Sequence, residues 1–184
     1  ADDISLKNRL YEQMKFLNKY DLDCVGCNME IFSENKSNSK FTNYPITHEN
    51  IIKVLKFDTC IPHPTWLIKK NVYEKLECYR DIHTCEDYDF LIRAALAGFR
   101  LGNSPIVGYR YRYNNNSISR TNASKQQCIR RYLSKNYGEK KICNITDMIS
   151  YLSSKNGYKI INSVDRYYYL KQKFPSLKIS TEMT

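Results

Sequence analysis

The spacing of apolar residues in the first quarter of the chain predicts a helix, a buried strand and a polar loop. The helix is expected from Ser5, which can cap it, to about Tyr20. Its apolar residues recur at helical spacing and share one face: Leu6, Leu10, Met14 and Leu17. The run Asp23–Phe32 is typical of a buried strand, and the Asn-, Ser- and Lys-rich segment Ser33–Tyr44 is typical of a loop.

The middle of the chain predicts shorter elements and one well-marked helix. Thr47 is expected to cap a short amphipathic helix, which a strand at Pro64–Ile68 and a helix at Asn71–Leu76 follow. A longer helix is expected at Glu86–Ala97, with an apolar stripe of Phe90, Leu91, Ala94 and Ala95. Thr84 or Cys85 is the expected cap of this helix, and Gly98 stands where a C-terminal glycine belongs.

The remainder of the chain predicts two strands and then basic helices. The strands are expected at Arg100–Gly102 and Ile106–Tyr113. From Asn122 onward the pattern is helical and basic, with breaks near Gly138 and at Asn156-Gly157.

Length and charge limit the class of protein and the kinds of partner that the sequence allows. With 184 residues, of which 42% are apolar and 26% charged, the chain is long enough for one domain with a hydrophobic core. The net charge of +10 favours anionic partners such as sugar nucleotides, a membrane surface or nucleic acid, although a solvated basic face explains it more simply. No apolar run reaches the length that spans a bilayer.

The cysteines favour buried thiols over a metal site. Seven cysteines are spread without the spacing of a disulfide framework, which indicates a reducing compartment. Cys24-x-x-Cys27 has the spacing of a zinc or redox pair, but it lies inside an expected strand. Side chains three apart on a strand point to opposite faces, and no second pair with ligand spacing follows.

Two acidic clusters, Asp2-Asp3 and Glu86-Asp87-x-Asp89, are the candidate chemical groups. Neighbouring carboxylates repel one another unless a cation or a helix end compensates. Asp2-Asp3 suits a hard cation that bridges a diphosphate, or it simply favours the dipole of the following helix. Acids are favoured at the start of a helix as well, yet an ionised Asp87 on a rigid element can accept the proton of a sugar hydroxyl.

Taken together and in order, several motifs resemble glycosyltransferase family 2. The stretch after the DxD motif of that family matches residues 1–5, 9–10, 13, 16–17 and 25–28. The strand ahead of its acceptor site matches 63–70, its acidic motif and helix match 79–80, 85–93 and 97–99, and its closing strand and loop match 111–112 and 117–119. The resemblance covers about residues 1–120, and the ordered set is far more specific than any single motif.

This resemblance implies a partial GT-A fold, a Rossmann-like α/β sandwich with a mixed sheet, followed by a helical basic tail. It implies transfer of a sugar from a nucleotide donor with inversion at the anomeric carbon. Asp2 corresponds to the second aspartate of the DxD motif and Asp3 to the acid beside it, so both are expected to hold Mg²⁺ or Mn²⁺ on the donor diphosphate. Asp87 corresponds to the catalytic base, and Glu86 precedes it in the same motif.

The same resemblance suggests acceptor contacts and a division of the chain. His63, Trp66 and Arg120 are the expected acceptor-binding residues, although His63, between two prolines, fits a buried hydrogen-bonded residue equally well. Residues 1–120 would form the acceptor-side half of a GT-A domain, and residues 121–184 a mostly helical extension. The first DxD aspartate and the nucleotide-binding half upstream are absent from the chain, so we expect a fragment that is inactive alone and exposes a sheet edge.

The expected partners are a nucleotide-sugar donor and a glycan, lipid-linked or protein acceptor. A cytoplasmic location is expected, with peripheral membrane contact through the basic tail. Two other functions compete with this interpretation: a basic, aromatic-rich module that binds a polyanion or nucleic acid, and a non-catalytic glycosyltransferase homologue. Nucleic acid is disfavoured because no RRM-type or zinc-finger spacing occurs.

The three acids of the second cluster are not expected to act alike. Successive helix residues are separated by about 100°, so Glu86, Asp87 and Asp89 cannot all face one site. We expect Asp89 to bond to nearby backbone or to Arg93, which lies one turn further on the same face.

Overall fold

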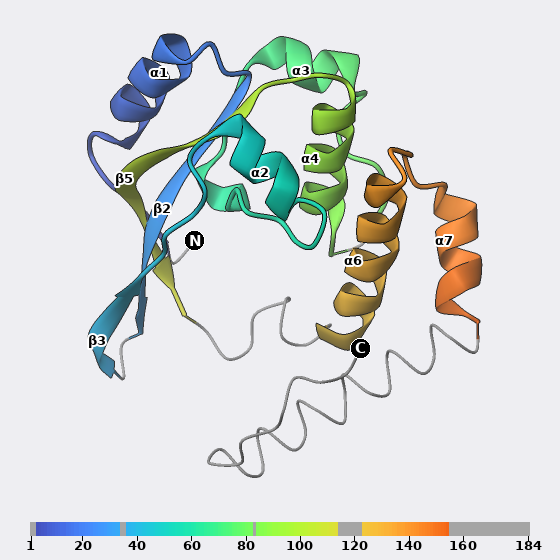
Figure 1. The fold of residues 1–184 in the computed structure, drawn as a ribbon. Helices are drawn as coiled ribbons and strands as arrows, with labels where there is room; N and C mark the ends of the chain where they lie inside the picture. Colours follow the sequence, from blue (N-terminus) through green and yellow to red (C-terminus); the bar gives the residue numbers. More distant parts are fainter. Residues whose placement is uncertain (1–2, 34–35, 83, 114–122, 155–184) are drawn as a thin grey trace.

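A mixed β-sheet forms one layer of the protein, toward one side of the molecule, as the computed structural model in Figure 1 shows. The structure describes residues 3–33, 36–82, 84–113 and 123–154. The strand order is β1-β5-β2-β3, and β4 pairs with another part of β2. The strands are β1 Ile4–Ser5, β2 Cys24–Ser33, β3 Lys36–Phe41, β4 Leu67–Ile68 and β5 Leu101–Arg112. Because β2 and β5 run parallel and the other pairings are antiparallel, the expected α/β class and mixed sheet are confirmed.

Helices cover both faces of this sheet. Leu17 and Leu22 pack against Val25 on one face, and the neighbouring Cys24 joins a larger hydrophobic cluster on the other. The helices are α1 Arg9–Lys19, α2 His48–Val54, the 3-10 helix η1 His63–Thr65, α3 Lys70–Lys75, α4 Glu86–Leu96, α6 Ala123–Gly138 and α7 Ile145–Leu152. None of the helices within the described residues is both long and apolar enough for a bilayer crossing.

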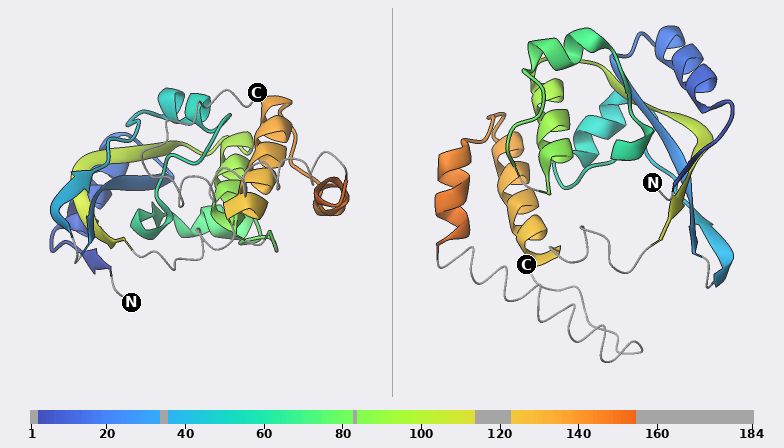
Figure 2. Two further views of the ribbon diagram at one scale, coloured as in Figure 1. Left: turned by 90° about the horizontal axis from the view of Figure 1, so that it is seen from below. Right: turned by 180° about the vertical axis from the view of Figure 1, so that it is seen from behind.

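Helices α6 and α7 extend the layers beyond α4. Figures 1 and 2 show the sheet, α4, α6 and α7 following one another across the molecule. Ile129, Leu133 and Met148 of these two helices share one buried cluster with Phe90 and Leu91 of α4. The break expected near Gly138 separates α6 from α7, while the break at 156–157 lies outside the described residues. The division of the chain at residue 120 stays a prediction.

The first helix begins later than its apolar pattern predicted. Ser5 does not cap it but pairs with Tyr109 in the sheet, and α1 begins only at Arg9. The Ser5 hydroxyl accepts a hydrogen bond from Arg9 Nε at 2.8 Å. Of the expected apolar stripe, Leu17 is buried, whereas three members stay exposed: Leu6, Leu10 and Met14. Pairing with β5 therefore takes the residues that periodicity assigned to the first helical turn.

Part of the segment expected to be a loop is a strand. In β3, Lys40 and Phe41 lie opposite Ile31 and Glu30 of β2. The Ser39 hydroxyl donates to the Glu30 carboxylate at 2.6 Å. The edge of β2 provides pairing partners for a polar sequence whose own composition does not favour a strand.

The strand expected at Pro64–Ile68 is mostly a 3-10 turn, since only Leu67–Ile68 pairs with β2. Thr65 explains the difference. Its hydroxyl donates to the Pro62 carbonyl at 2.8 Å and accepts the Cys27 N–H at 3.2 Å, so the chain curls around this buried side chain.

The two strands expected on either side of Pro105 are one continuous strand. Ser104 pairs with Cys27 and Val107 with Asn28, so an irregularity absorbs the residues between them. The Asn28 side chain donates to the Pro105 carbonyl at 3.3 Å. Proline has no N–H to donate, and a bulge is one of the few places where a sheet tolerates it.

Besides the cap expected at Ser5, capping was predicted correctly at two positions and wrongly at the start of α4. Thr47 accepts the Asn50 N–H at 3.4 Å at the start of α2. Gly98, with φ of 84°, follows α4 as expected. Cys85 occupies the N-cap position of α4, but neither it nor Thr84 caps the helix through a side chain.

The interpretation of Cys24 and Cys27 as buried thiols is confirmed. Both are free, buried and on opposite faces of β2. Burial raises the pKa of both thiols, which keeps them protonated and unsuited to metal binding.

Candidate active site

The first turn of α4 presents a half-buried carboxylate at Asp87. One of its oxygens accepts the Tyr88 N–H at 2.7 Å. Burial raises the pKa of Asp87 above its ordinary value, while the Tyr88 N–H and the nearby His63 act in the opposite direction. Among the described residues Asp87 forms no ion pair, and the electrostatic effects of His63 and Arg130 offset its burial only in part. Such a carboxylate is a stronger base than an ordinary aspartate.

Two residues further on, the negative charge of Asp89 is balanced by two arginines. It is 1% exposed and receives hydrogen bonds from Arg93 Nε at 2.8 Å and from both Nε and Nη2 of Arg80. The predicted bond to Arg93 is thereby confirmed. Arg80 was not predicted as a partner, because it lies in a loop nine positions away and no local spacing indicates it.

The two arginines also hold the chain that precedes α4. Arg93 donates to the carbonyls of Leu76 at 2.6 Å and Cys78 at 2.8 Å. Arg80 donates to the Cys143 carbonyl at 2.8 Å, which ties the same loop to the start of α7. Asp89 therefore anchors the segment between α3 and α4 instead of facing a ligand.

An aromatic cluster surrounds Phe90, which lies one turn after Asp87 on α4. The ring centroids of Tyr73, Tyr79 and Trp66 lie 4.8, 5.2 and 5.7 Å from that of Phe90. Residues three apart on a helix share a face, so Asp87 lies at the edge of this cluster.

The predicted acceptor residues His63 and Trp66 belong to the same cluster. Their ring centroids are 4.6 Å apart. His63 is exposed, and its Nε2 lies 3.0 Å from the Tyr79 hydroxyl. Trp66 is half-buried and its N–H donates to the Ile61 carbonyl at 2.9 Å, so its polar group is already used. The structure thus brings His63 and Asp87 together, with Trp66 packed between His63 and the helix.

A second carboxylate, Asp3, lies just before the edge strand β1 and is held at the end of β5. Its carboxylate accepts the Arg112 N–H at 2.8 Å and the Tyr109 hydroxyl at 3.3 Å. A carboxylate has lone pairs for further partners, and a hard oxygen donor suits Mg²⁺ or Mn²⁺. Asp3 therefore fits as one oxygen ligand of such an ion.

The rest of the expected metal site cannot be placed in the same way. Asp2 lies outside the described residues, as does the predicted acceptor residue Arg120. In the part of the chain that the structure describes, no three His, Cys, Asp or Glu side chains gather into a metal site. The metal contacts at Asp2 and Asp3 stay predictions.

A polar network connects Asp3 with the segment that carries His63. The Arg9 guanidinium lies over the ring of Tyr109, 5.6 Å from its centroid, and donates to the Thr65 carbonyl at 3.2 Å. The buried Gln13 amide donates to the same carbonyl at 2.7 Å. Sequence reasoning missed this role of Gln13, although a fully buried glutamine in α1 requires bonding partners.

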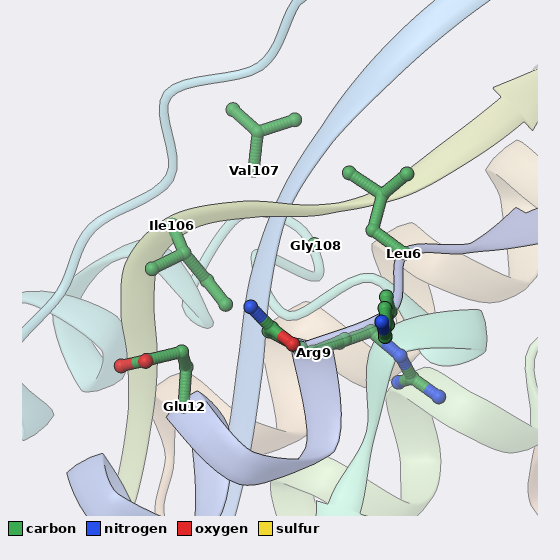
Figure 3. A pocket seen from close by; sticks show the side chains of 8 residues that line it. Leu6, Arg9, Glu12, Ile106, Val107 and Gly108 are labelled. Atoms are coloured by element: carbon green, nitrogen blue, oxygen red, sulfur yellow. The ribbon is translucent and has the colours of Figure 1, made fainter.

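A pocket of about 340 Å³ lies elsewhere, between the start of α1 and β5 (Figure 3). Its lining residues are Leu6, Lys7, Asn8, Arg9, Glu12, Ile106, Val107 and Gly108. Neither Asp87 nor His63 lines it, and its surface is mainly apolar. We therefore place the candidate active site at the start of α4, where the half-buried Asp87 carboxylate lies, and not in this pocket.

Comparison with known proteins finds similarity to glycosyltransferases. The O-antigen biosynthesis glycosyltransferase WbnJ of Escherichia coli is 32% identical over 130 residues, which cover 70% of this chain and 51% of WbnJ. The bifunctional glycosyltransferase pgtA of Dictyostelium discoideum is 27% identical over 163 residues, covering 69% of this chain and 21% of pgtA. The chain is similar to glycosyltransferases. It spans about half the length of WbnJ and a smaller share of pgtA.

A structural relative and the family comparison complete these findings. The crystal structure of S. aureus TarS 1–349 in complex with UDP aligns with a TM-score of 0.47 and 15% identity, over 98% of this chain and 49% of that chain. No protein-family model matches the chain.

Proposed function

We propose that the protein carrying this chain is a metal-assisted, inverting glycosyltransferase of the GT-A fold, with Asp87 as its general base. It moves a sugar from a nucleotide-sugar donor to an acceptor hydroxyl. The observation that carries the proposal is the half-buried carboxylate of Asp87, which has no ion-pair partner among the described residues. Burial raises its pKa, and the exposed His63 lies nearby. Similarity to proteins named glycosyltransferases supports the class of reaction.

Asp87 would act on the acceptor hydroxyl. One carboxylate oxygen is held by the Tyr88 N–H, which leaves the other to accept the hydroxyl proton. The acceptor oxygen then forms a bond to the anomeric carbon while the bond from that carbon to the diphosphate breaks. The diphosphate leaves with the electron pair of that bond, and attack from the opposite side inverts the configuration. Glu86 precedes Asp87 at the helix start, where the helix dipole favours negative charge.

Asp2 and Asp3 would hold Mg²⁺ or Mn²⁺ against the donor. A bound divalent ion neutralises the charge that develops on a leaving diphosphate. The Arg112 N–H and the Tyr109 hydroxyl hold the Asp3 carboxylate at the end of β5, which supports this proposed role.

His63, Trp66 and Arg120 would contact the acceptor, which could be a glycan, a lipid-linked sugar or a protein. Of the two that the structure describes, His63 is exposed, and the half-buried Trp66 packs against it. We keep the cytoplasmic location and the membrane contact through the basic tail as parts of the proposal.

Transfer itself is tested with the full-length protein that carries this chain. Incubation with UDP-, GDP- and TDP-sugars, Mn²⁺ and a mixture of simple acceptors should give a glycosylated product, detected by mass spectrometry. NMR of the new anomeric proton should show inverted configuration. Retained configuration would contradict a single displacement, and a protein that binds the donor but forms no product would support the non-catalytic alternative.

The metal role is tested by calorimetry on the same protein. Donor binding should require Mn²⁺ or Mg²⁺, and Asp2→Ala should abolish both this dependence and the activity. Asp23→Ala is a suitable control, since Asp23 pairs with Lys69 at the start of β2. Equal donor affinity with and without metal would remove Asp2 from this role.

A further inference from the structure

Three polar aromatic side chains form a hydrogen-bonded row beside Asp87. The Tyr73 hydroxyl lies 3.1 Å from the Tyr79 hydroxyl, and the latter lies 3.0 Å from His63 Nε2. We call Tyr73, Tyr79 and His63 the polar aromatic row. Tyr79 is its central member, and it was not among the acceptor contacts that the sequence suggested.

The row is exposed on one side and supported on the other. Tyr79 keeps 38% of its surface accessible, and His63 is exposed as well. Phe90 packs behind Tyr79, with centroids 5.2 Å apart, and Trp66 packs against His63. Within the described residues His63 Nδ1 forms no hydrogen bond. The row therefore exposes aromatic ring surface together with a ring nitrogen that a ligand can hydrogen-bond.

The backbone on both sides of Tyr79 is fixed. The Cys78 carbonyl accepts from Arg93, and the Arg80 side chain is bound to Asp89. Glu77 and Cys78 have positive φ angles of 55° and 61°, a conformation that non-glycine residues adopt only where the surroundings hold them. Tyr79 is therefore pre-organised, which reduces the entropy lost when a ligand binds.

A sugar ring matches the chemistry of this row. A pyranose carries hydroxyl groups around its rim and C–H groups on its faces, so it complements aromatic rings that end in hydroxyl and imidazole groups. A lipid chain would favour an apolar groove instead, and the mainly apolar pocket between α1 and β5 does not include these residues.

We propose that the polar aromatic row binds a pyranose ring of the acceptor, and that Tyr79 is a specificity-determining contact that directs the attacking hydroxyl toward Asp87. This inference rests on the proposed function and narrows it, since it selects a carbohydrate acceptor over a lipid or protein hydroxyl. Burial raises the pKa of the Tyr79 hydroxyl, which therefore stays protonated and able to donate.

Ligand-observed NMR titration tests this binding without depending on catalysis. The probes are methyl glycopyranosides of glucose, galactose and their N-acetylated forms, added to the full-length protein. A Ser/Thr peptide and a polyprenyl phosphate serve as the competing acceptor classes. At least one pyranoside should bind, and Tyr79→Phe should weaken it about 3- to 10-fold, as expected for one lost hydrogen bond. Tyr20→Phe makes the same change at an exposed tyrosine just after α1 and should leave the affinity unchanged.

The outcomes separate this inference from the proposed function. Equal pyranoside affinity in Tyr79→Phe and wild type, or binding of only the peptide or the polyprenyl phosphate, would overturn the inference while sugar transfer still stands. Pyranoside binding that depends on Tyr79, in a protein that transfers no sugar, would leave the site intact and refute the function. A thermal unfolding curve of Tyr79→Phe that matches wild type confirms that the variant is folded.

Discussion

Asp87 and Asp89 lie two residues apart on α4 and differ in almost every physical property. Asp89 is 1% exposed and bound by two arginines, whereas Asp87 is half-buried and forms no ion pair among the described residues. A rotation of about 200° around the helix separates the two side chains. One helix turn therefore serves both as an anchor for the fold and as the position of a reactive carboxylate.

The difference shows how the fold stabilises an unfavourable group. Burial of the Asp87 carboxylate costs free energy that the electrostatic effects of His63 and Arg130 offset only in part, and the net cost appears as a raised pKa. The Arg80–Asp89–Arg93 network and the apolar packing of Phe90 and Leu91 hold the helix in place in spite of that cost. Asp87 is the residue that stability alone would not select, which is typical of a functional position.

The largest loss of stability is expected when Asp89, which anchors the segment between α3 and α4, is replaced. Asp89→Asn leaves Arg93, a side chain only 6% exposed, as a buried charge without its carboxylate. Removing one partner of a buried ion pair costs roughly 3–5 kcal/mol, so the free energy of unfolding should fall by about this amount. Urea denaturation followed by circular dichroism measures it, and an unchanged midpoint would mean that Asp89 is not an anchor.

A smaller loss of stability is expected from Arg93→Lys. This substitution tests whether Arg93 acts through its charge alone or also through its bonds to the backbone. Lysine keeps the positive charge near Asp89 but cannot also reach the carbonyls of Leu76 and Cys78. We expect a destabilisation of about 1.5–3 kcal/mol, typical of a lost hydrogen bond to a charged group. Lys70→Arg on the exposed start of α3 is the matched control, and stability equal to wild type in Arg93→Lys would show that charge alone suffices.

The smallest change in stability is expected from Asp87→Asn, and this substitution should stabilise the protein. The pKa of Asp87 is raised in the folded protein above its ordinary value of 3.8, so the folded state holds the proton more tightly than the unfolded chain. Stability therefore falls as the pH rises from the ordinary pKa through the raised one, and the cost is fully present above the raised pKa. Asp87→Asn removes this cost and should raise the melting temperature at pH 7.

The pH series provides the control for that prediction. Below the ordinary pKa of Asp87 both forms are neutral, so wild type and Asp87→Asn should converge there. A variant that is less stable than wild type at pH 7, or a difference that does not change with pH, would contradict the desolvated carboxylate.

Local patterns predicted much of this helix. Periodicity placed it at Glu86–Ala97, close to the observed Glu86–Leu96, and a spacing of four residues indicated the Asp89–Arg93 pair. Both signals are local, because helix neighbours lie three or four positions apart in the sequence. The resemblance to a known family, not the pattern, singled out Asp87 and His63.

Contacts between distant segments could not be predicted in this way. Tyr79 reaches His63 across 16 positions, and Arg9 reaches Thr65 across 56, so no sequence spacing indicates either pair. The same holds for β3, whose polar residues pair only because the edge of β2 is available. Tertiary contacts decide such cases, and they override local propensity.

The single-turnover rate of sugar transfer tests the central claim most directly. It compares wild type, Asp87→Asn and Asp89→Asn of the full-length protein. The donor is saturating, the enzyme exceeds the acceptor, and the temperature is below the unfolding temperature of each variant. Asp87→Asn keeps the size and the Tyr88 contact but cannot accept a proton, so its rate should fall about 10²- to 10⁴-fold while donor affinity stays near wild type. Asp89→Asn should lose stability far more than rate. Transfer by Asp87→Asn at close to the wild-type rate would contradict the assignment of Asp87 as the base.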